Sequence, residues 1–100
     1  MNIIITRLLT GEEVLGEIDN LDDKFVTIKN PTSIAVVNNP KTKNVDIHMG
    51  PWAPLSSDKS VKISILAITC QYSPVTDIVN KYNSMFGSGI IVPNTDLSTL

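Results

Sequence analysis

Residues 11–25, GEEVLGEIDNLDDKF, decide the fold, because two glycines and an aspartate punctuate a strand pattern there. Gly11 follows the apolar segment Ile3 to Leu9 and predicts a tight hairpin turn, since glycine adopts positive φ at little cost. Gly16 lies inside the next strand, residues 13–19, where an interior glycine indicates a sharp bend or the close approach of another backbone. The stretch therefore predicts a small, strongly curved β-structure.

The remainder of the first 70 residues continues as short strands separated by turn residues. Asn30-Pro31 interrupts one of them, and because proline lacks the ladder donor, we expect an edge position or a bulge there. The apolar run Leu66-Ala67-Ile68 indicates a segment buried on both faces. Three strands are predicted after residue 20. The first spans residues 25–29 and resumes at 34–37, the second spans 45–49, and the third spans 61–65 and continues to 70.

One helix is predicted at about residues 74–86. Ser73 is a suitable N-cap, Pro74 fits the first helical position, and Gly87 with Gly89 ends the pattern. One face of this helix is apolar and predicts packing against the sheet. That face comprises Val75, Ile78, Val79, Tyr82 and Phe86.

The fold class that follows is mainly β, a small five-stranded open barrel of the Sm-like or SH3-like type with a C-terminal α-helix. An OB-type barrel is the alternative. Residues 1–89 form a single domain, and residues 90–100 form a polar C-terminal tail.

The bulk properties suit a soluble cytoplasmic protein, of a bacterium or of a phage-infected bacterial host. Arg7 interrupts the apolar N-terminus, which argues against a secretory signal, and no run reaches membrane-spanning length. Cys70 is the only cysteine, so no disulfide is expected, and its strand pattern indicates a small buried hydrophobe. The core of a 100-residue chain is modest, so an oligomeric interface would add stability.

The formal net charge of −2 conceals an uneven distribution. Residues 1–23 hold six acidic side chains and one arginine, whereas residues 24–100 hold seven lysines and four aspartates. General attraction to polyanions is thus excluded, and contact with nucleic acid would require a local basic surface. Two solvated faces of opposite sign are the simpler interpretation.

The spacing of Gly11, Gly16, Ile18, Asp22 and Phe25 resembles the first half of the Sm-like (LSm) RNA-binding signature. The resemblance implies a curved barrel whose copies form a homo-oligomeric ring, a pentamer to heptamer, that holds RNA near its central pore. The sequence departs from the Sm-like signature at two places, so the usual nucleotide pocket of the family cannot be assigned to this chain. The departures are Val26 in place of a base-reading Asn, and Ala67-Ile68-Thr69-Cys70 where the family has an Arg-Gly pair.

Two further segments resemble short Sm-like proteins of marine phages. They are Pro51-Trp52-Ala53-Pro54-Leu55 and the run from Tyr82 to Gly89. This resemblance implies no biochemical role.

Catalysis and metal binding have little support in the sequence. His48 is the only histidine, so a Ser-His-Asp arrangement has no suitable spacing. Asp22-Asp23 lacks the additional oxygen ligands of a calcium loop, and these carboxylates are expected to bond the turn backbone. We expect no catalytic residue, no metal, no cofactor and no enzymatic activity.

Candidate nucleic-acid contacts are basic and aromatic side chains. Within the Sm-like resemblance, Lys24 would meet a phosphate near the pore, and Phe25 takes the apolar position of the motif. Trp52, between two prolines, either plugs one end of the barrel, contacts another subunit or stacks on a base, and the plug or intersubunit contact is favoured. The remaining phosphate candidates are Lys41, Lys43, Lys59 and Lys62.

The sequence supports two hypotheses of different classes. In the first, a non-enzymatic Sm-like ring binds RNA or single-stranded DNA in nucleic-acid processing. In the second, a phage scaffold or assembly adaptor binds protein through the Trp52 loop and the C-terminal helix.

Overall fold

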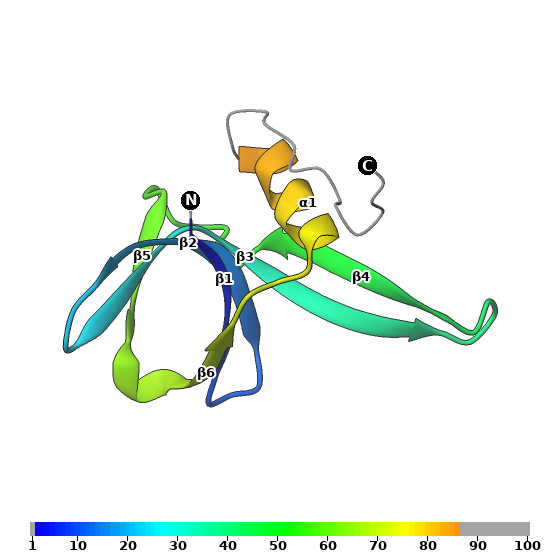
Figure 1. Ribbon diagram of the computed structural model, residues 1–100, viewed down its shortest axis with the longest axis horizontal. Coiled ribbons are helices and arrows are strands. Elements are labelled where there is room, and N and C mark those ends of the chain that lie inside the picture. Colours follow the sequence, from blue (N-terminus) through cyan, green and yellow to red (C-terminus); the bar gives the residue numbers. More distant parts are fainter. Residues whose placement is uncertain (1, 87–100) are drawn as a thin grey trace.

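The computed structural model describes residues 2–86, whose strands form one antiparallel sheet that curls into an open barrel (Figure 1). The helix α1 lies outside this barrel, against the sheet. In chain order the elements are β1 (Ile3–Leu8), β2 (Glu13–Leu21), β3 (Phe25–Asn39), β4 (Asn44–Pro51), β5 (Ser60–Ser64), the 3-10 turn η1 (Ile65–Ala67), β6 (Ile68–Tyr72) and α1 (Thr76–Phe86).

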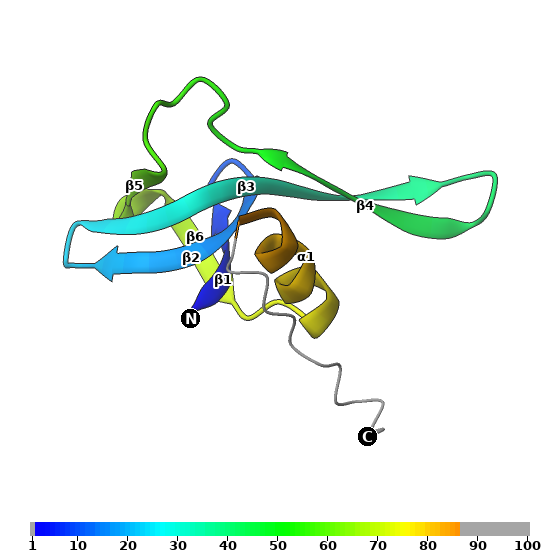
Figure 2. The ribbon, with the colours of Figure 1, turned by 90° about the horizontal axis from the view of Figure 1, so that it is seen from above.

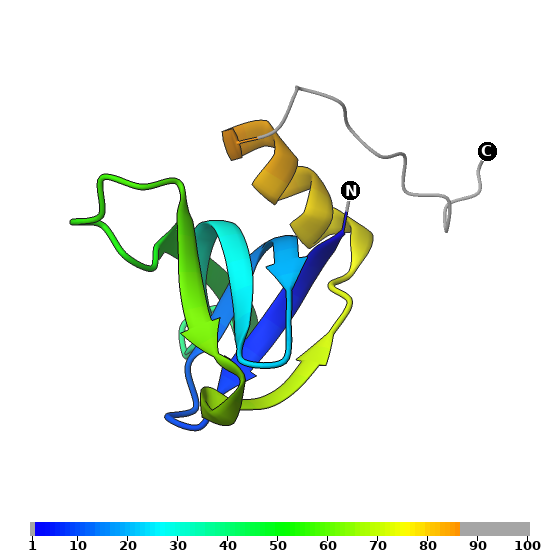
Figure 3. The ribbon, with the colours of Figure 1, turned by 90° about the vertical axis from the view of Figure 1, so that its left-hand side faces the viewer.

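The strand order is β4-β3-β2-β1-β6, and β5 pairs with β3. Within the described residues β5 and β6 are not paired with each other, and η1 connects them at the base of the barrel (Figure 3). The barrel is therefore open on this side. The predicted class, a mainly β open barrel with a C-terminal helix, is confirmed.

The long strand β3 has two successive partners on one of its edges. Its first part pairs with β5, from Phe25↔Ser64 to Lys29↔Ser60, and its second part pairs with β4, from Thr32↔Pro51 to Asn39↔Asn44. Residues 52–59 form a loop between the two pairings, opposite only Asn30 and Pro31. Beyond Ile34, the strand β3 and the part of β4 paired with it leave the barrel as a projecting hairpin (Figure 2).

The sheet separates two apolar clusters. Inside the barrel, one cluster contains Leu8, Val14, Val26, Ile28 and Ile63. On the outer face, under α1, the other contains Ile3, Ile5, Leu15, Ile34 and Tyr82, with Met49, Ile78 and Val79 packed against it. Both faces of the β1-β2-β3 region are thus buried, as expected for a small barrel carrying an external helix.

The two glycines of the decisive stretch have different physical roles. Gly11 has φ of +92° and ends the β1–β2 turn, where its N–H donates to Leu8 O at 2.9 Å. Gly16 lies at an irregularity of the β2–β3 pairing, between Leu15↔Thr32 and Glu17↔Lys29. A Cβ at Gly16 would lie 2.2 Å from Ile28 Cγ2 and 2.9 Å from Lys29 O. The predicted turn and the predicted close approach are both confirmed.

Tyr82 of α1 completes the hydrogen bonding at this irregularity. Its hydroxyl accepts from Glu17 N at 3.2 Å and donates to the carbonyl oxygen of Lys29, so it bridges two paired residues of β2 and β3. Burial raises the pKa of Tyr82, which keeps this donor protonated. The ring is only 2% exposed and packs in the outer cluster, so α1 is held by both apolar and polar contacts.

Four sequence expectations require correction or comment. The run Leu66-Ala67-Ile68 is not buried on both faces, because the chain turns there as η1 and leaves Leu66 87% exposed. The helix begins at Thr76, two residues after the predicted start at about residue 74, and Val75 O accepts its first backbone hydrogen bonds. Cys70, expected to be buried, is exposed on the edge strand β6. The predicted tail 90–100 lies outside the described residues.

Replacing Gly16 with alanine should destabilise the fold by at least about 2 kcal/mol, because the new methyl group overlaps the stiff branched side chain of Ile28 and a backbone oxygen. Gly50→Ala is the matched control, since nothing lies within 4 Å of its added Cβ, and its effect should stay within about 1 kcal/mol. Urea unfolding followed by circular dichroism measures both. Equal effects of the two substitutions would contradict the close approach at Gly16.

Tyr82→Phe should cost about 1–3 kcal/mol of unfolding free energy, because it leaves the partly buried Glu17 N–H and Lys29 C=O without their partner. Tyr72→Phe removes a hydroxyl that donates to Glu13 at an exposed site, and it should cost clearly less. Chemical denaturation of both variants tests this difference. A Tyr82→Phe variant as stable as the wild type would show that the hydroxyl bridge contributes nothing.

Candidate nucleic-acid-binding site

The site begins with the turn that joins β2 to β3. Asp22 Oδ1 accepts hydrogen bonds from the backbone N–H groups of Lys24 at 2.8 Å and Phe25 at 2.7 Å, and Asp22 N donates to Phe25 O at 3.0 Å. This Asx-type turn fixes the direction in which β3 begins. The expectation that Asp22 bonds the turn backbone is confirmed.

The loop between β5 and β6 forms the other side of the site. Ser64 Oγ accepts from Leu66 N at 3.2 Å and so caps η1, and Ile65 N donates to Lys24 O at 2.9 Å. The second bond joins η1 directly to the β2–β3 turn. Two loops that are distant in sequence are therefore held side by side.

Between these loops lies an open hollow of about 350 Å³, and most of its surface is apolar. Phe25 is 39% exposed, and Lys62 Nζ lies 5.9 Å from the centre of its ring, a cation–π distance. The lining residues are Asp23, Lys24, Phe25, Ser64, Ile65 and Leu66. An accessible aromatic ring with lysines nearby can stack on a base while the lysines contact phosphates.

The charges around the hollow nearly balance. Hydrogen bonds from the backbone N–H groups of Lys24 and Phe25 lower the pKa of Asp22, and the positive charge of Lys62 adds to this effect. Asp22 therefore stays ionised at neutral pH, and Asp23 is a further exposed carboxylate on the rim. A single copy consequently offers little net attraction to a polyanion.

The other candidate residues from the sequence are elsewhere. Lys41 and Lys43 lie at the tip of the projecting hairpin, away from the barrel (Figure 1). Lys59 precedes β5 at the end opposite to η1, where it lines a separate hollow of about 250 Å³. Only Lys24, Phe25 and Lys62 of the predicted set are brought together.

Trp52 is partly buried against the cluster inside the barrel, and its backbone N–H donates to Pro31 O at 3.0 Å. This placement agrees with the plug interpretation, and Trp52 does not line the hollow beside Phe25. The helix α1 likewise directs Ile78, Val79 and Tyr82 onto the sheet. Both elements invoked for an adaptor thus use apolar residues within the chain.

Ser64 and Leu66 were not predicted from the sequence to be part of the site. The only available signal was Ser64 two residues before Leu66, a pattern that can cap a short turn. The continuous apolar run made burial the more natural interpretation.

Within residues 2–86, no three His, Cys, Asp or Glu side chains gather where they could hold a metal ion. In the same part of the chain, no helix is long and apolar enough to cross a membrane.

Comparison with models of known protein families and with curated proteins finds no match to this chain. The Sm-like resemblance therefore remains a prediction from the sequence. In this barrel Gly11 lies in a turn, Gly16 lies at a bend and Asp22 lies in a second turn. The geometry of the chain explains these three residues without the resemblance.

Asp22 should contribute to stability in a pH-dependent manner. Because its folded-state pKa lies below the unfolded value, its contribution is fully present above the unfolded pKa of about 4 and is lost as pH falls through the folded pKa. Asp22→Ala should therefore destabilise the protein at pH 7, and the difference from the wild type should shrink on acidification below pH of about 4. Denaturation at several pH values measures this. Asp23→Ala is the control, and an equal effect at Asp23 would contradict the role of the turn bonds.

Proposed function

We propose that this protein is a non-enzymatic, ring-forming Sm-like protein that binds RNA or single-stranded DNA at the hollow beside Phe25. The observation that carries the proposal is an open, largely apolar hollow lined by Lys24 and Phe25, with Lys62 Nζ at a cation–π distance from the Phe25 ring. Stacking on an aromatic ring tolerates any base, which suits the absence of a base-reading amide at Val26.

The free strand edges support the ring. Strands β4 and β6 end the sheet, and within the described residues each pairs on one side only. Unpaired edges of this kind favour pairing with another chain. A head-to-tail contact between β4 of one copy and β6 of the next would repeat around an axis and could close into a ring.

A ring would also raise the affinity for nucleic acid, which the nearly balanced charges of one copy keep low. In one copy Lys24 and Asp23 line the hollow, Lys62 lies by the Phe25 ring and Asp22 lies in the adjoining turn, so we expect a low affinity for phosphate groups. Several copies around an axis would bind one strand at successive nucleotides, and linked weak sites give a much higher combined affinity. We expect binding with little sequence preference and with strong dependence on salt.

Fluorescence anisotropy with labelled oligo-U RNA and oligo-dT DNA at 50 mM salt tests the proposal. Phe25→Leu should weaken binding about 10-fold or more, because it keeps an apolar side chain but removes the stacking surface. Lys62→Gln should weaken binding and reduce its salt dependence. Asp23→Asn should strengthen binding, because it removes a negative charge from the rim of the hollow.

Lys81→Gln is the matched control, since Lys81 is an exposed lysine on α1, outside the hollow. It should leave affinity nearly unchanged. Absence of binding to either oligonucleotide at low salt and 100 µM protein, roughly the limit of non-specific binding, would refute the nucleic-acid function. An effect of Lys81→Gln as large as that of Lys62→Gln would refute this location.

A further inference from the structure

The outer part of the β3–β4 hairpin, residues 35–48, has no partner within the described chain, and we call it the arm. The pairing of β2 with β3 ends at Glu13↔Ile34, so beyond Ile34 the strand β3 pairs with β4 alone. The arm extends away from the barrel and from α1 (Figure 2). An isolated two-stranded hairpin is only marginally stable in water, so the arm would gain stability from being covered.

One face of the arm continues the outer apolar cluster. Ile34 and Met49 form a cross-strand pair in that cluster, and residues two positions further along each strand lie on the same face. These are Val36 and Ile47, which pair with each other and are 61% and 37% exposed. Val45 follows on the same face and is 57% exposed. An apolar stripe therefore leads from beneath α1 to the middle of the arm.

At the base of the arm this stripe borders a hollow of about 310 Å³, with mostly apolar walls. Val36 and Ile47 line one side, and Tyr72, Val75 and Ile78 line the side nearest to α1. Tyr72 and Val75 are 42% and 69% exposed. The helix thus covers only part of the outer face, and the uncovered part is apolar on both sides of the hollow.

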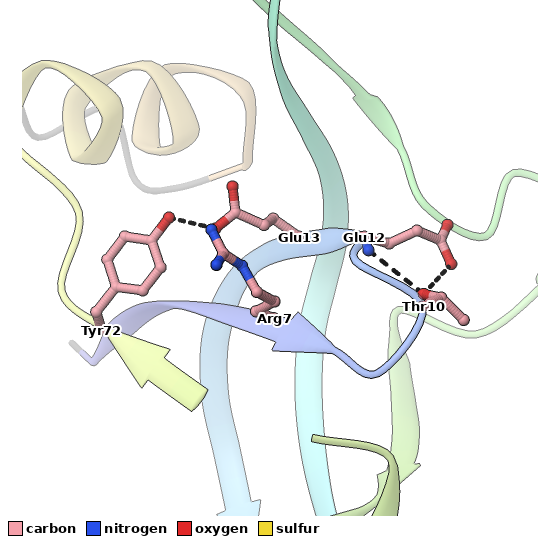
Figure 4. Close-up of polar contacts among 5 residues, drawn as sticks. All are labelled: Arg7, Thr10, Glu12, Glu13 and Tyr72. Atoms are coloured by element: carbon pink, nitrogen blue, oxygen red, sulfur yellow. Dashed lines mark hydrogen bonds and ion pairs between the residues drawn. The ribbon is translucent and has the colours of Figure 1, made fainter. Parts of the chain in front are cut away.

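The polar groups at the edge of this hollow already bond one another (Figure 4). Arg7 Nη2 lies 3.1 Å from Glu13 Oε2, and the Tyr72 hydroxyl donates to the same carboxylate. Burial together with this hydrogen bond raises the pKa of Tyr72 to about 12. A covering surface therefore needs no counter-charge here, which suits an apolar partner.

We propose that the uncovered face binds the same face of a second copy of this chain, with the two arms antiparallel about a two-fold axis. Each arm would then cover the hollow of its partner with Val36, Val45 and Ile47. In this arrangement, the tip of each arm lies near the base of the other. A self-complementary apolar patch of this kind is the usual basis of a two-fold contact.

The charges at the two ends of the face agree with this arrangement. Lys41 and Lys43 lie at the tip of the arm, and they make no ion pair within residues 2–86. Asp77 is exposed in the first turn of α1, between two residues that line the hollow at the base. Antiparallel arms place these opposite charges at the same end of the contact, whereas parallel arms would bring the lysines of both copies together.

The face contact does not depend on the proposed ring. It uses side chains on one face of the sheet and leaves the outer edges of β4 and β6 free. A ring built through the edges could therefore associate face to face with a second ring. The two contacts can be separated by experiment.

Sedimentation velocity of the full chain at 1–100 µM, about the range in which modest dimers form, tests the face contact. In the double variant Val36→Asp/Ile47→Asp, each unpaired carboxylate opposes burial, and the association constant should fall at least about 100-fold. The matched control is Ala35→Asp/Val37→Asp, which places the same charges on the opposite face of the same hairpin and should associate like the wild type. Circular dichroism establishes that both variants remain folded.

Charge reversal provides a second measurement. Lys41→Glu/Lys43→Glu should weaken association, and adding Asp77→Lys should restore part of it. A wild type that stays at one-copy mass, equal effects of the two double variants, or self-association only after removal of residues 87–100 would each overturn the proposal. An oligomer whose mass survives Val36→Asp/Ile47→Asp would also overturn it, while leaving the edge-paired ring intact.

Discussion

The hydroxyl of Tyr82 occupies a gap in the β2–β3 ladder, and the fold depends on this contact. Gly16 allows β2 to approach Ile28 and Lys29 of β3 so closely that no side chain would fit. The ladder is irregular there, and a phenol from α1 supplies the missing acceptor and donor. A buried backbone group left without a partner costs about 1–3 kcal/mol, so the helix and the bend stabilise each other. The helix, although it lies outside the barrel, is thus an integral part of the fold.

The same irregularity divides β3 into two parts with different partners. Asn30 has φ of 49°, and Pro31 has no N–H to donate, so neither residue continues the pairing of β3 with β2. Before them β3 closes the barrel with β5, and after them it leaves the barrel with β4. The aromatic ring and lysines of the candidate site therefore lie at one end of β3, and the apolar arm lies at the other. One strand carries two surfaces of different chemistry.

Much of this architecture could be predicted from local sequence, because turns and caps depend on single residues. Gly11 predicted a turn, Gly16 a close approach, and Asp22 a carboxylate bonded to the backbone. The partner switch of β3 could not be predicted, since it depends on which strands meet in space. The apolar run at Leu66 was misinterpreted for a related reason: Ser64 caps a 3-10 turn there, and periodicity alone cannot distinguish a buried strand from an exposed turn. Lysines scattered through the sequence likewise gave no indication that only Lys24 and Lys62 would meet at Phe25.

The two surfaces impose opposite requirements on assembly. In the proposed function, the hollow beside Phe25 must stay open to bind a strand of nucleic acid, and because its charges nearly balance, affinity would come from repetition around an axis. The apolar face of the arm would gain stability from being covered, because its valines and isoleucine extend the outer apolar cluster into solvent. Phe25 and Lys62 lie on the β3–β5 part of the barrel, whereas the apolar face lies beside α1 and β4. The proposed association through the arm would therefore leave the hollow open, so the two proposed interactions use different residues.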